Sequence, residues 1–187
     1  MTFYEDDAMR EWHEERRRHR LEIFCRQRPA NLRDAGDLHP DVAAWGRRLL
    51  DGDAANLVLA GQVGTGKTWS AFEVLERAIS DGYPGRVMVV SGSRWRTAIA
   101  PPTDRSALAA MTAADILLLD DLGAGRGNEW ERELLLGVAD ERWAHRRPTI
   151  TTTNTPDLTA AFGERIVSRL ADRATVVILN GQDRRAR

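Results

Sequence analysis

Short apolar runs alternate with longer amphipathic segments through most of the chain. The apolar runs are rich in leucine and β-branched residues, and they are short enough to be buried strands. The expected strands are 56–60, 86–91, 115–119, 149–153 and 175–179. The expected helices among them are 68–80, a short one around 95–99, and 129–145. Strands that alternate with helices in this way predict an α/β fold with a five-stranded parallel sheet flanked by helices.

The first 28 residues follow a different pattern. Residues 2–28 contain neither proline nor glycine and place acids first and arginines last, which predicts one long helix whose charges suit the helix dipole. Its apolar residues, including Phe3, Met9 and Trp12, form a broken stripe, so we expect a helix with no core to join. We therefore divide the chain into an N-terminal helical extension, 1–28, and a second unit, 29–187, whose first helix is expected at 41–50.

Composition narrows the protein class. A length of 187 residues with 42% hydrophobic and 29% charged residues is typical of a globular domain. The apolar runs are too short to span a membrane, and the acidic and arginine-rich start does not resemble a signal peptide, so we expect a cytoplasmic protein. Cys25 is the single cysteine, which excludes a disulfide or a cysteine-based zinc site within one chain.

Lysine and arginine total 27, yet the only lysine is Lys67, which therefore calls for explanation. It lies in a stretch that matches the phosphate-binding P-loop in full and follows the first expected strand. The matching residues are Gly61, Gln62, Val63, Gly64, Thr65, Gly66, Lys67 and Thr68. The glycines let backbone N–H groups surround phosphate oxygens, Lys67 would reach the β- and γ-phosphates of ATP, and Thr68 would bind Mg²⁺. The alternative is a tight glycine turn with a surface lysine.

Two acids, Asp120 and Asp121, follow the third expected strand. Ligands gather at the carboxyl ends of parallel strands, so we assign Asp120 to Mg²⁺ through its water shell and Asp121 to the base that orients the attacking water. The alternative is a strand-end turn with exposed acids. Lys67 and Asp120 lie 53 residues apart, whereas one βαβ unit needs ~30. The extra length holds the strand expected at 86–91 and its helix, so we expect one strand between the P-loop strand and the acid strand, an arrangement that disfavours a simple small-molecule kinase.

Three other positions are candidates for the same chemistry. Asn154 ends the fourth expected strand and could hold the attacking water, although an asparagine before Thr155 and a proline also suits a turn. Arg165 and Arg169 are four residues apart and share a helix face. Such an arginine can stabilise a neighbouring subunit's γ-phosphate, or it can be a solvated residue bonded to Glu164 or Asp172.

A net charge of −1 gives no overall basic surface for nucleic acid, so any contact must be local. Arg94, Trp95 and Arg96 are the candidates for single-stranded DNA, because one aromatic flanked by arginines offers stacking and backbone charge. Trp95 as part of a helix-packing core is the competing interpretation. The segment 163–187 is net positive and could touch DNA or a second subunit. The segment 29–34 is expected near the adenine.

Five motifs occur in a fixed order: GQVGTGKT at 61–68, ILLLDDLGA at 116–124, RRPTITTTN at 146–154, GERIVSRL at 163–170 and GQDRR at 181–185. Together they resemble the AAA+ ATPases of the DnaC/DnaI helicase-loader family, which includes the IstB transposition helpers, and the resemblance covers about 29–187. It implies an ATPase that is Mg²⁺-dependent and oligomeric when ATP-bound. It also implies a loader that binds the replicative DNA helicase and single-stranded DNA. The alternative within the family is a transposition helper that binds double-stranded DNA.

The resemblance implies a role for each matching residue. Lys67 and Thr68 correspond to Walker A, Asp120 and Asp121 to Walker B, and Asn154 to sensor 1. Arg169 resembles the arginine finger that acts in trans, and Arg185 resembles sensor 2.

The sequence departs from the family pattern in three places. Asp121 stands where many AAA+ proteins have glutamate. Only 18 residues follow Arg169, so we expect a reduced or absent C-terminal lid. Only residues 1–28 are available to grip a helicase, and our hypothesis is that they do so; the alternative is a helix packed back on its own domain.

Overall fold

The computed structural model describes residues 3–122, 128–155, 157, 159 and 162–180, and within them the chain forms one sheet of five parallel strands. The strands are β1 (Leu57–Ala60), β2 (Val87–Ser91), β3 (Ile116–Asp120), β4 (Thr149–Thr153) and β5 (Thr175–Ile178). Their order across the sheet is β2-β3-β4-β1-β5. The predicted five-stranded parallel α/β fold is confirmed.

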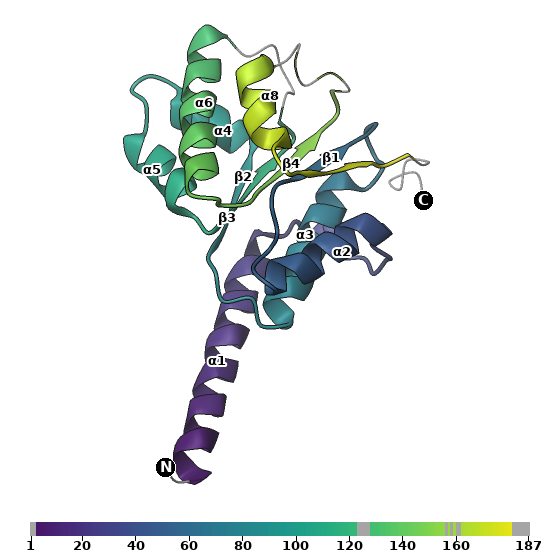
Figure 1. Ribbon diagram of the computed structural model, residues 1–187, viewed down its shortest axis with the longest axis vertical. Helices are drawn as coiled ribbons and strands as arrows, with labels where there is room; N and C mark the ends of the chain where they lie inside the picture. The colour runs from purple at the N-terminus through teal and green to yellow at the C-terminus, as the bar shows by residue number, and fades with distance from the viewer. Residues whose placement is uncertain (1–2, 123–127, 156, 158, 160–161, 181–187) are drawn as a thin grey trace.

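Helices cover both faces of the sheet (Figure 1). They are α1 (Phe3–Gln27), the 3-10 turn η1 (Ala30–Leu32), α2 (Pro40–Leu50), α3 (Lys67–Ser80), α4 (Gly92–Ile99), α5 (Arg105–Ala113), α6 (Glu129–Ala144) and α8 (Glu164–Ala171). Side chains of a strand alternate between faces. Ile116 and Leu118 therefore join the core beneath α2 and α3, while Leu117 and Leu119 join the core beneath α4, α6 and α8.

One strand lies between the P-loop strand and the acid strand, as the spacing predicts. That strand is β4, which comes later in the chain. The spacing argument relied on the strand at 86–91, β2, and that part of the prediction is wrong, because β2 lies at the edge of the sheet beyond β3. Between Lys67 and Asp120 the chain therefore crosses from β1 to β2 at the edge of the sheet, and β3 then pairs with β2 on its inner side.

Helix α5 was not predicted from the sequence. Its apolar residues are mostly small alanines, and only Met111 is buried among them, so the periodic signal is weak. The cis bond between Pro101 and Pro102 separates it from α4. The available signal was Asp104, whose carboxylate accepts the Ala107 N–H at 2.9 Å and caps the helix.

Helix α1 extends from the body of the molecule (Figure 1). In its first half Met9 and Trp12 are exposed. Its last turns differ from the expectation of a helix with no core to join. Phe24 is buried against Phe72 of α3, with ring centroids 5.7 Å apart. Immediately after the helix, the buried Arg28 pairs with two acids of α3, Glu73 and Glu76, at 2.9 and 2.6 Å. The helix therefore has an exposed half and an anchored end.

Two expectations concern the end of the chain. Arg185 lies in 181–187, outside the described residues, so its sensor 2 role and the reduced lid stay predictions. In the described part of the chain, no helix has both the length and the apolarity that crossing a membrane requires.

Candidate nucleotide-binding site

The P-loop connects β1 to α3 and is closed on itself by hydrogen bonds. Gly64 and Gly66 have φ of 83° and 91°, which suits residues without a Cβ. The Lys67 ammonium donates to the carbonyls of Gly61 at 2.8 Å and Gln62 at 2.6 Å. The loop therefore already has the curled form in which backbone N–H groups can surround an anion at the start of a helix.

A cleft of about 430 Å³ opens beside this loop at the carboxyl ends of the strands. It is lined by Pro29, Asn31, Leu32, Val63, Gly64, Gly66, Lys67, Thr68, Trp69, Asp120, Asp121, Thr152 and Asn154. The structure thus brings Lys67, Thr68, the two acids and Asn154 together, as the sequence predicts. Three predicted P-loop residues, Gly61, Gln62 and Thr65, do not line the cleft. They form the base of the loop, where Thr65 donates its hydroxyl proton to the Gln62 carbonyl at 2.9 Å.

The two acids have different environments. Asp120 ends β3 and accepts hydrogen bonds from the hydroxyls of Thr152, at 2.7 Å, and of Thr68. Burial raises the pKa of Asp120, and these two hydrogen bonds oppose the rise by stabilising the carboxylate. Asp121 is exposed, and its backbone is left-handed with φ of 59°. Its carboxylate accepts the Asn154 amide at 3.0 Å, which joins the third and fourth strands at the cleft.

The donor set suits Mg²⁺, which prefers a few oxygen ligands and keeps several waters. Thr68 and Asp120 offer a hydroxyl and a carboxylate in contact with each other beside Lys67. Nowhere in the described ranges do three histidine, cysteine or acidic side chains gather into a metal cluster. The residues therefore fit an ion held by these two side chains and by the phosphates of a nucleotide.

The segment 29–34, which the sequence led us to expect near the adenine, contributes to the same cleft. Pro29, Asn31 and Leu32 line the cleft. The indole N–H of Trp69 donates to the Asp34 carbonyl at 2.8 Å, so α3 itself fixes this segment beside the P-loop. The sequence pointed to the segment but not to Trp69, which carries no recognisable motif.

Sequence reasoning missed Thr152. It is one of three consecutive threonines, and only the pairing of β4 with β3 shows which of them faces the acids. Its side chain is 1% exposed and contacts Asp120 and Asp121.

Arg169 lies away from this cleft. It is at the amino ends of the strands, whereas the cleft is at their carboxyl ends. Its carbonyl accepts the amide of Asn56, which immediately precedes β1, at 2.9 Å. Its Nε donates to the Asp140 carboxylate at 2.7 Å, and its guanidinium lies 4.2 Å from the Trp143 ring centroid. The predicted partners Glu164 and Asp172 are not those that it uses. Arg165, on the same helix, is exposed.

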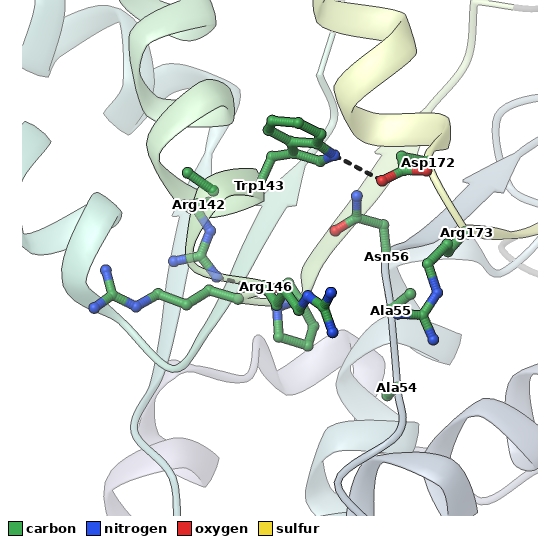
Figure 2. A pocket seen from close by; sticks show the side chains of 11 residues that line it. Ala54, Ala55, Asn56, Arg142, Trp143, Arg146, Asp172 and Arg173 are labelled. Atoms are coloured by element: carbon green, nitrogen blue, oxygen red, sulfur yellow. Dashed lines mark hydrogen bonds between the residues drawn. The ribbon is translucent and has the colours of Figure 1, made fainter.

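A second cleft, of about 340 Å³, lies between the ends of α6 and α8 (Figure 2). Arg142 forms its wall and is 1% exposed, with hydrogen bonds to the carbonyls of Met111, Ala114 and Pro148 at 2.8, 2.7 and 2.6 Å. Burial lowers its pKa to about 10. Trp143 donates its indole N–H to Asp172 at 2.6 Å, the dashed contact in Figure 2. This edge ties helices to strands through polar groups that the sequence did not single out.

The proposed stacking residue for single-stranded DNA is wrong, and the competing interpretation is confirmed. Trp95 is 2% exposed, packs in the core beneath α6, and donates its indole N–H to Glu131 at 3.0 Å. Its neighbours Arg94 and Arg96 are exposed on α4. Helix periodicity accounts for the difference, because the face that carries Trp95 also carries Ala98 and Ile99 inward.

Comparison with known proteins places the chain in a family. A family model described as IstB-like ATP binding protein matches residues 49–187. The replicative helicase loader DnaC of Escherichia coli strain K12 is 24% identical over 144 residues, which are 73% of this chain and 59% of that protein. A putative ATP-binding protein of insertion sequence IS1162 from Pseudomonas fluorescens is 34% identical over 110 residues, 58% of this chain and 47% of that protein.

The chain therefore spans between about half and three fifths of the length of these two relatives. Among solved structures, the crystal structure of the DnaC helicase loader has a TM-score of 0.65 and 23% identity, covering 80% of this chain and 96% of that chain. This likeness shows a common fold. Because the family model spans most of the sequence and the P-loop, acid and asparagine elements meet in one cleft, the chain belongs to the IstB-like ATP-binding family, the DnaC/IstB-type AAA+ ATPases.

Proposed function

We propose that this protein is an ATP-dependent loader of the replicative DNA helicase, which binds that helicase and single-stranded DNA and hydrolyses ATP at a subunit interface. The observation that carries the proposal is the pairing of a projecting helix with a cleft in which the P-loop, the two acids and Asn154 meet. The cleft supplies the ATP-dependent part, and the exposed half of α1 supplies a surface for a partner. The likeness to DnaC supports the choice of partner.

ATP hydrolysis in the cleft would use each side chain according to its position. Lys67 and the P-loop N–H groups would hold the β- and γ-phosphates, and Thr68 and Asp120 would hold Mg²⁺. Mg²⁺, when bound, neutralises charge that develops on the phosphate oxygens. Asp121 and Asn154, joined at 3.0 Å, orient the attacking water, and Asp121 accepts its proton.

Arg169 would complete the site of a neighbouring copy. Its place at the far edge of the sheet from its own cleft supports a role in trans, since the side chain cannot serve both edges. Asp140 and Trp143 hold its guanidinium in one orientation, which reduces the entropy lost when it contacts a phosphate. An ATP-bound homo-oligomer follows from this role.

The exposed half of α1 would dock on the helicase. Met9 and Trp12 are 58% and 47% exposed, and large apolar and aromatic side chains are the usual anchors of protein interfaces. The Cζ of Arg16 lies 4.6 Å from the Trp12 ring centroid, and this stacking holds the indole in its orientation. The other end of α1 is anchored to α3 by Phe24 and Arg28. A movement of α1 on binding a partner would therefore be transmitted to α3, which starts at Lys67.

The test is the solution mass of the chain mixed with its host's replicative helicase, with ATP and without, by light scattering. A complex heavier than the helicase ring is expected. The double variant Met9→Ala with Trp12→Ala should lose it. The matched control is Trp130→Ala, which removes a similarly exposed indole from α6 and should keep it. A wild-type chain that leaves the helicase mass unchanged in both conditions would overturn the loader proposal.

The second candidate function is a transposition helper that binds duplex DNA. The 34% identity to the insertion-sequence protein favours it. Fluorescence anisotropy with single-stranded and duplex oligonucleotides of one sequence separates the two functions. Preference for duplex together with no helicase complex supports the helper, whereas preference for the single strand supports the loader.

A further inference from the structure

Thr152 occupies the junction between the two acids of the nucleotide cleft. Strands β3 and β4 are paired in parallel, with Leu119 opposite Thr151, so the next residues along, Asp120 and Thr152, emerge together at the cleft. The Thr152 side chain is 1% exposed, and its hydroxyl lies beneath the acids.

The hydroxyl of Thr152 makes two hydrogen bonds of opposite sense. It donates to the Asp120 carboxylate at 2.7 Å and accepts the Asp121 backbone N–H at 2.8 Å. The carbonyl of Thr152 accepts the Leu122 N–H at 2.9 Å. One residue of β4 thus holds three consecutive residues at the end of β3.

Asp121 requires such support. Its φ of 59° is a left-handed conformation that costs an aspartate of the order of 1 kcal/mol and persists where the surroundings impose it. The carbonyl of Asp121 also faces Gly92, where an added Cβ would lie 2.9 Å from that oxygen. In this conformation the Asp121 carboxylate meets Asn154.

The neighbouring Thr151 shows that a threonine in this strand need not have a partner. Its hydroxyl is buried and makes no hydrogen bond in the described structure. Thr151 and Thr152 are adjacent, are both fully buried, and differ in whether the hydroxyl is used. They therefore form a matched pair for experiment.

We propose that Thr152 is a positioning residue for ATP hydrolysis, which fixes the direction of the Asp120 carboxylate and the left-handed conformation of Asp121. The inference rests on the proposed ATPase activity. By donating to one oxygen of Asp120, the hydroxyl sets the direction in which the carboxylate faces Thr68, the residue with which it would hold Mg²⁺. By accepting the Asp121 N–H, it aims the adjacent carboxylate at Asn154 and the attacking water. Thr152 touches neither nucleotide nor water in this scheme and acts through the two acids.

The test compares Thr152→Val, Thr152→Ser and Thr151→Val in steady-state ATP hydrolysis and in titration with a fluorescent ATP analogue. Thr152→Val is nearly isosteric, and kcat is expected to fall roughly ten- to a hundredfold because misplaced catalytic groups lose rate steeply. The dissociation constant of the analogue should change less than about threefold, since the P-loop is untouched. Thr152→Ser should recover most of kcat, and Thr151→Val should match wild type. Unchanged kcat in a folded Thr152→Val chain would overturn the proposal, as would an equal loss in Thr151→Val.

A second measurement reports on the geometry without depending on turnover. Hydrogen exchange of the Asp121 amide should quicken in Thr152→Val and remain slow in Thr152→Ser and Thr151→Val, because only the first removes the acceptor. Thr152→Ala serves the same purpose if the valine variant does not fold. A wild-type chain without ATPase activity would overturn the proposed function. Unchanged Asp121 exchange would overturn the positioning role independently of that result.

Discussion

Polar side chains have contrasting roles at the carboxyl ends of the strands, here called the carboxyl edge, and at their amino ends, here called the amino edge. At the carboxyl edge, Lys67, Asp120 and Asn154 line an open cleft, and their hydrogen bonds join the loops that frame it. At the amino edge, Arg142 is buried, and its N–H groups donate to the carbonyls of Met111 in the last turn of α5, of Ala114 and of Pro148. Asn56 links the end of α8 to the start of β4 through the Arg169 carbonyl and the Thr149 N–H.

The contrast indicates that the two edges have different tasks. A ligand site keeps polar groups at a concave surface, where a phosphate or an ion can add to their contacts. In a structural network, the polar groups find their hydrogen-bond partners within the protein. Removing one partner destabilises the fold, because it leaves a buried polar group unsatisfied. Variants at the carboxyl edge should therefore change chemistry at little cost in stability, and those at the amino edge should do the reverse. Arg169 is the exception, because it belongs to the amino edge and is proposed to act in chemistry.

The largest effect is expected from Lys67→Met at the carboxyl edge. Loss of the ammonium removes the charge that would meet the β- and γ-phosphates, so affinity for ATP should fall by roughly a hundredfold or more and turnover should be undetectable. Titration with a fluorescent ATP analogue measures the first and phosphate release the second. Thermal unfolding is the control, and a melting temperature near wild type is expected. Retained affinity would show that this loop is only a structural turn.

Arg169→Ala should come next, and it tests the exception. Trans-acting arginines contribute about 10³ or more to turnover, so kcat should fall by roughly that factor while affinity for ATP is kept. Arg165→Ala is the matched control, because that arginine lies on the same helix, is exposed, and should leave kcat within a few-fold. A mixture of Arg169→Ala and Lys67→Met chains should regain activity. The first chain supplies an intact cleft, and the second supplies an intact Arg169 to that cleft. Equal loss in both arginine variants would remove the special role of Arg169.

Arg142→Met sharpens the comparison from the structural side. It leaves the carbonyls of Met111, Ala114 and Pro148 without their donor in a buried place, so unfolding free energy should fall by roughly 3–5 kcal/mol. In a domain of this size, that lowers the melting temperature by about 6–20 °C. Arg10→Met on exposed α1 is the control and should change the melting temperature little. A large loss of ATP affinity in folded Arg142→Met would break the separation of the two edges.

The parts of the molecule that sequence could predict are those whose signal is local. The P-loop combines composition, spacing and flanking elements within one short segment, and the strand ending in Asp120 has four apolar residues before it. Thr152 was not predictable, because its identity among three threonines depends on strand pairing. Trp95 and Trp12 look alike in sequence, and only packing buries one and exposes the other. Arg142 carries no local mark in a chain rich in arginine, since its partners lie up to 31 residues away.

Asp140→Asn is expected to have the smallest effect and is the finest probe of the exception. The Asp140–Arg169 pair is partly exposed, with side chains 39% and 32% exposed, so its loss should lower the unfolding free energy by less than about 1 kcal/mol. Asparagine keeps the size and a carbonyl acceptor but removes the charge that holds the Arg169 Nε at 2.7 Å.

If Asp140 orients Arg169 for a neighbour's phosphate, kcat should fall several-fold at constant ATP affinity. The loss should vanish in an Arg169→Ala background, where no guanidinium remains to orient. If instead the ion pair holds Arg169 back from that phosphate, kcat would rise in Asp140→Asn, and the orienting role argued for Asp140 would be wrong. A double-mutant cycle over the two residues, read in both kcat and melting temperature, separates the contribution to chemistry from the contribution to stability.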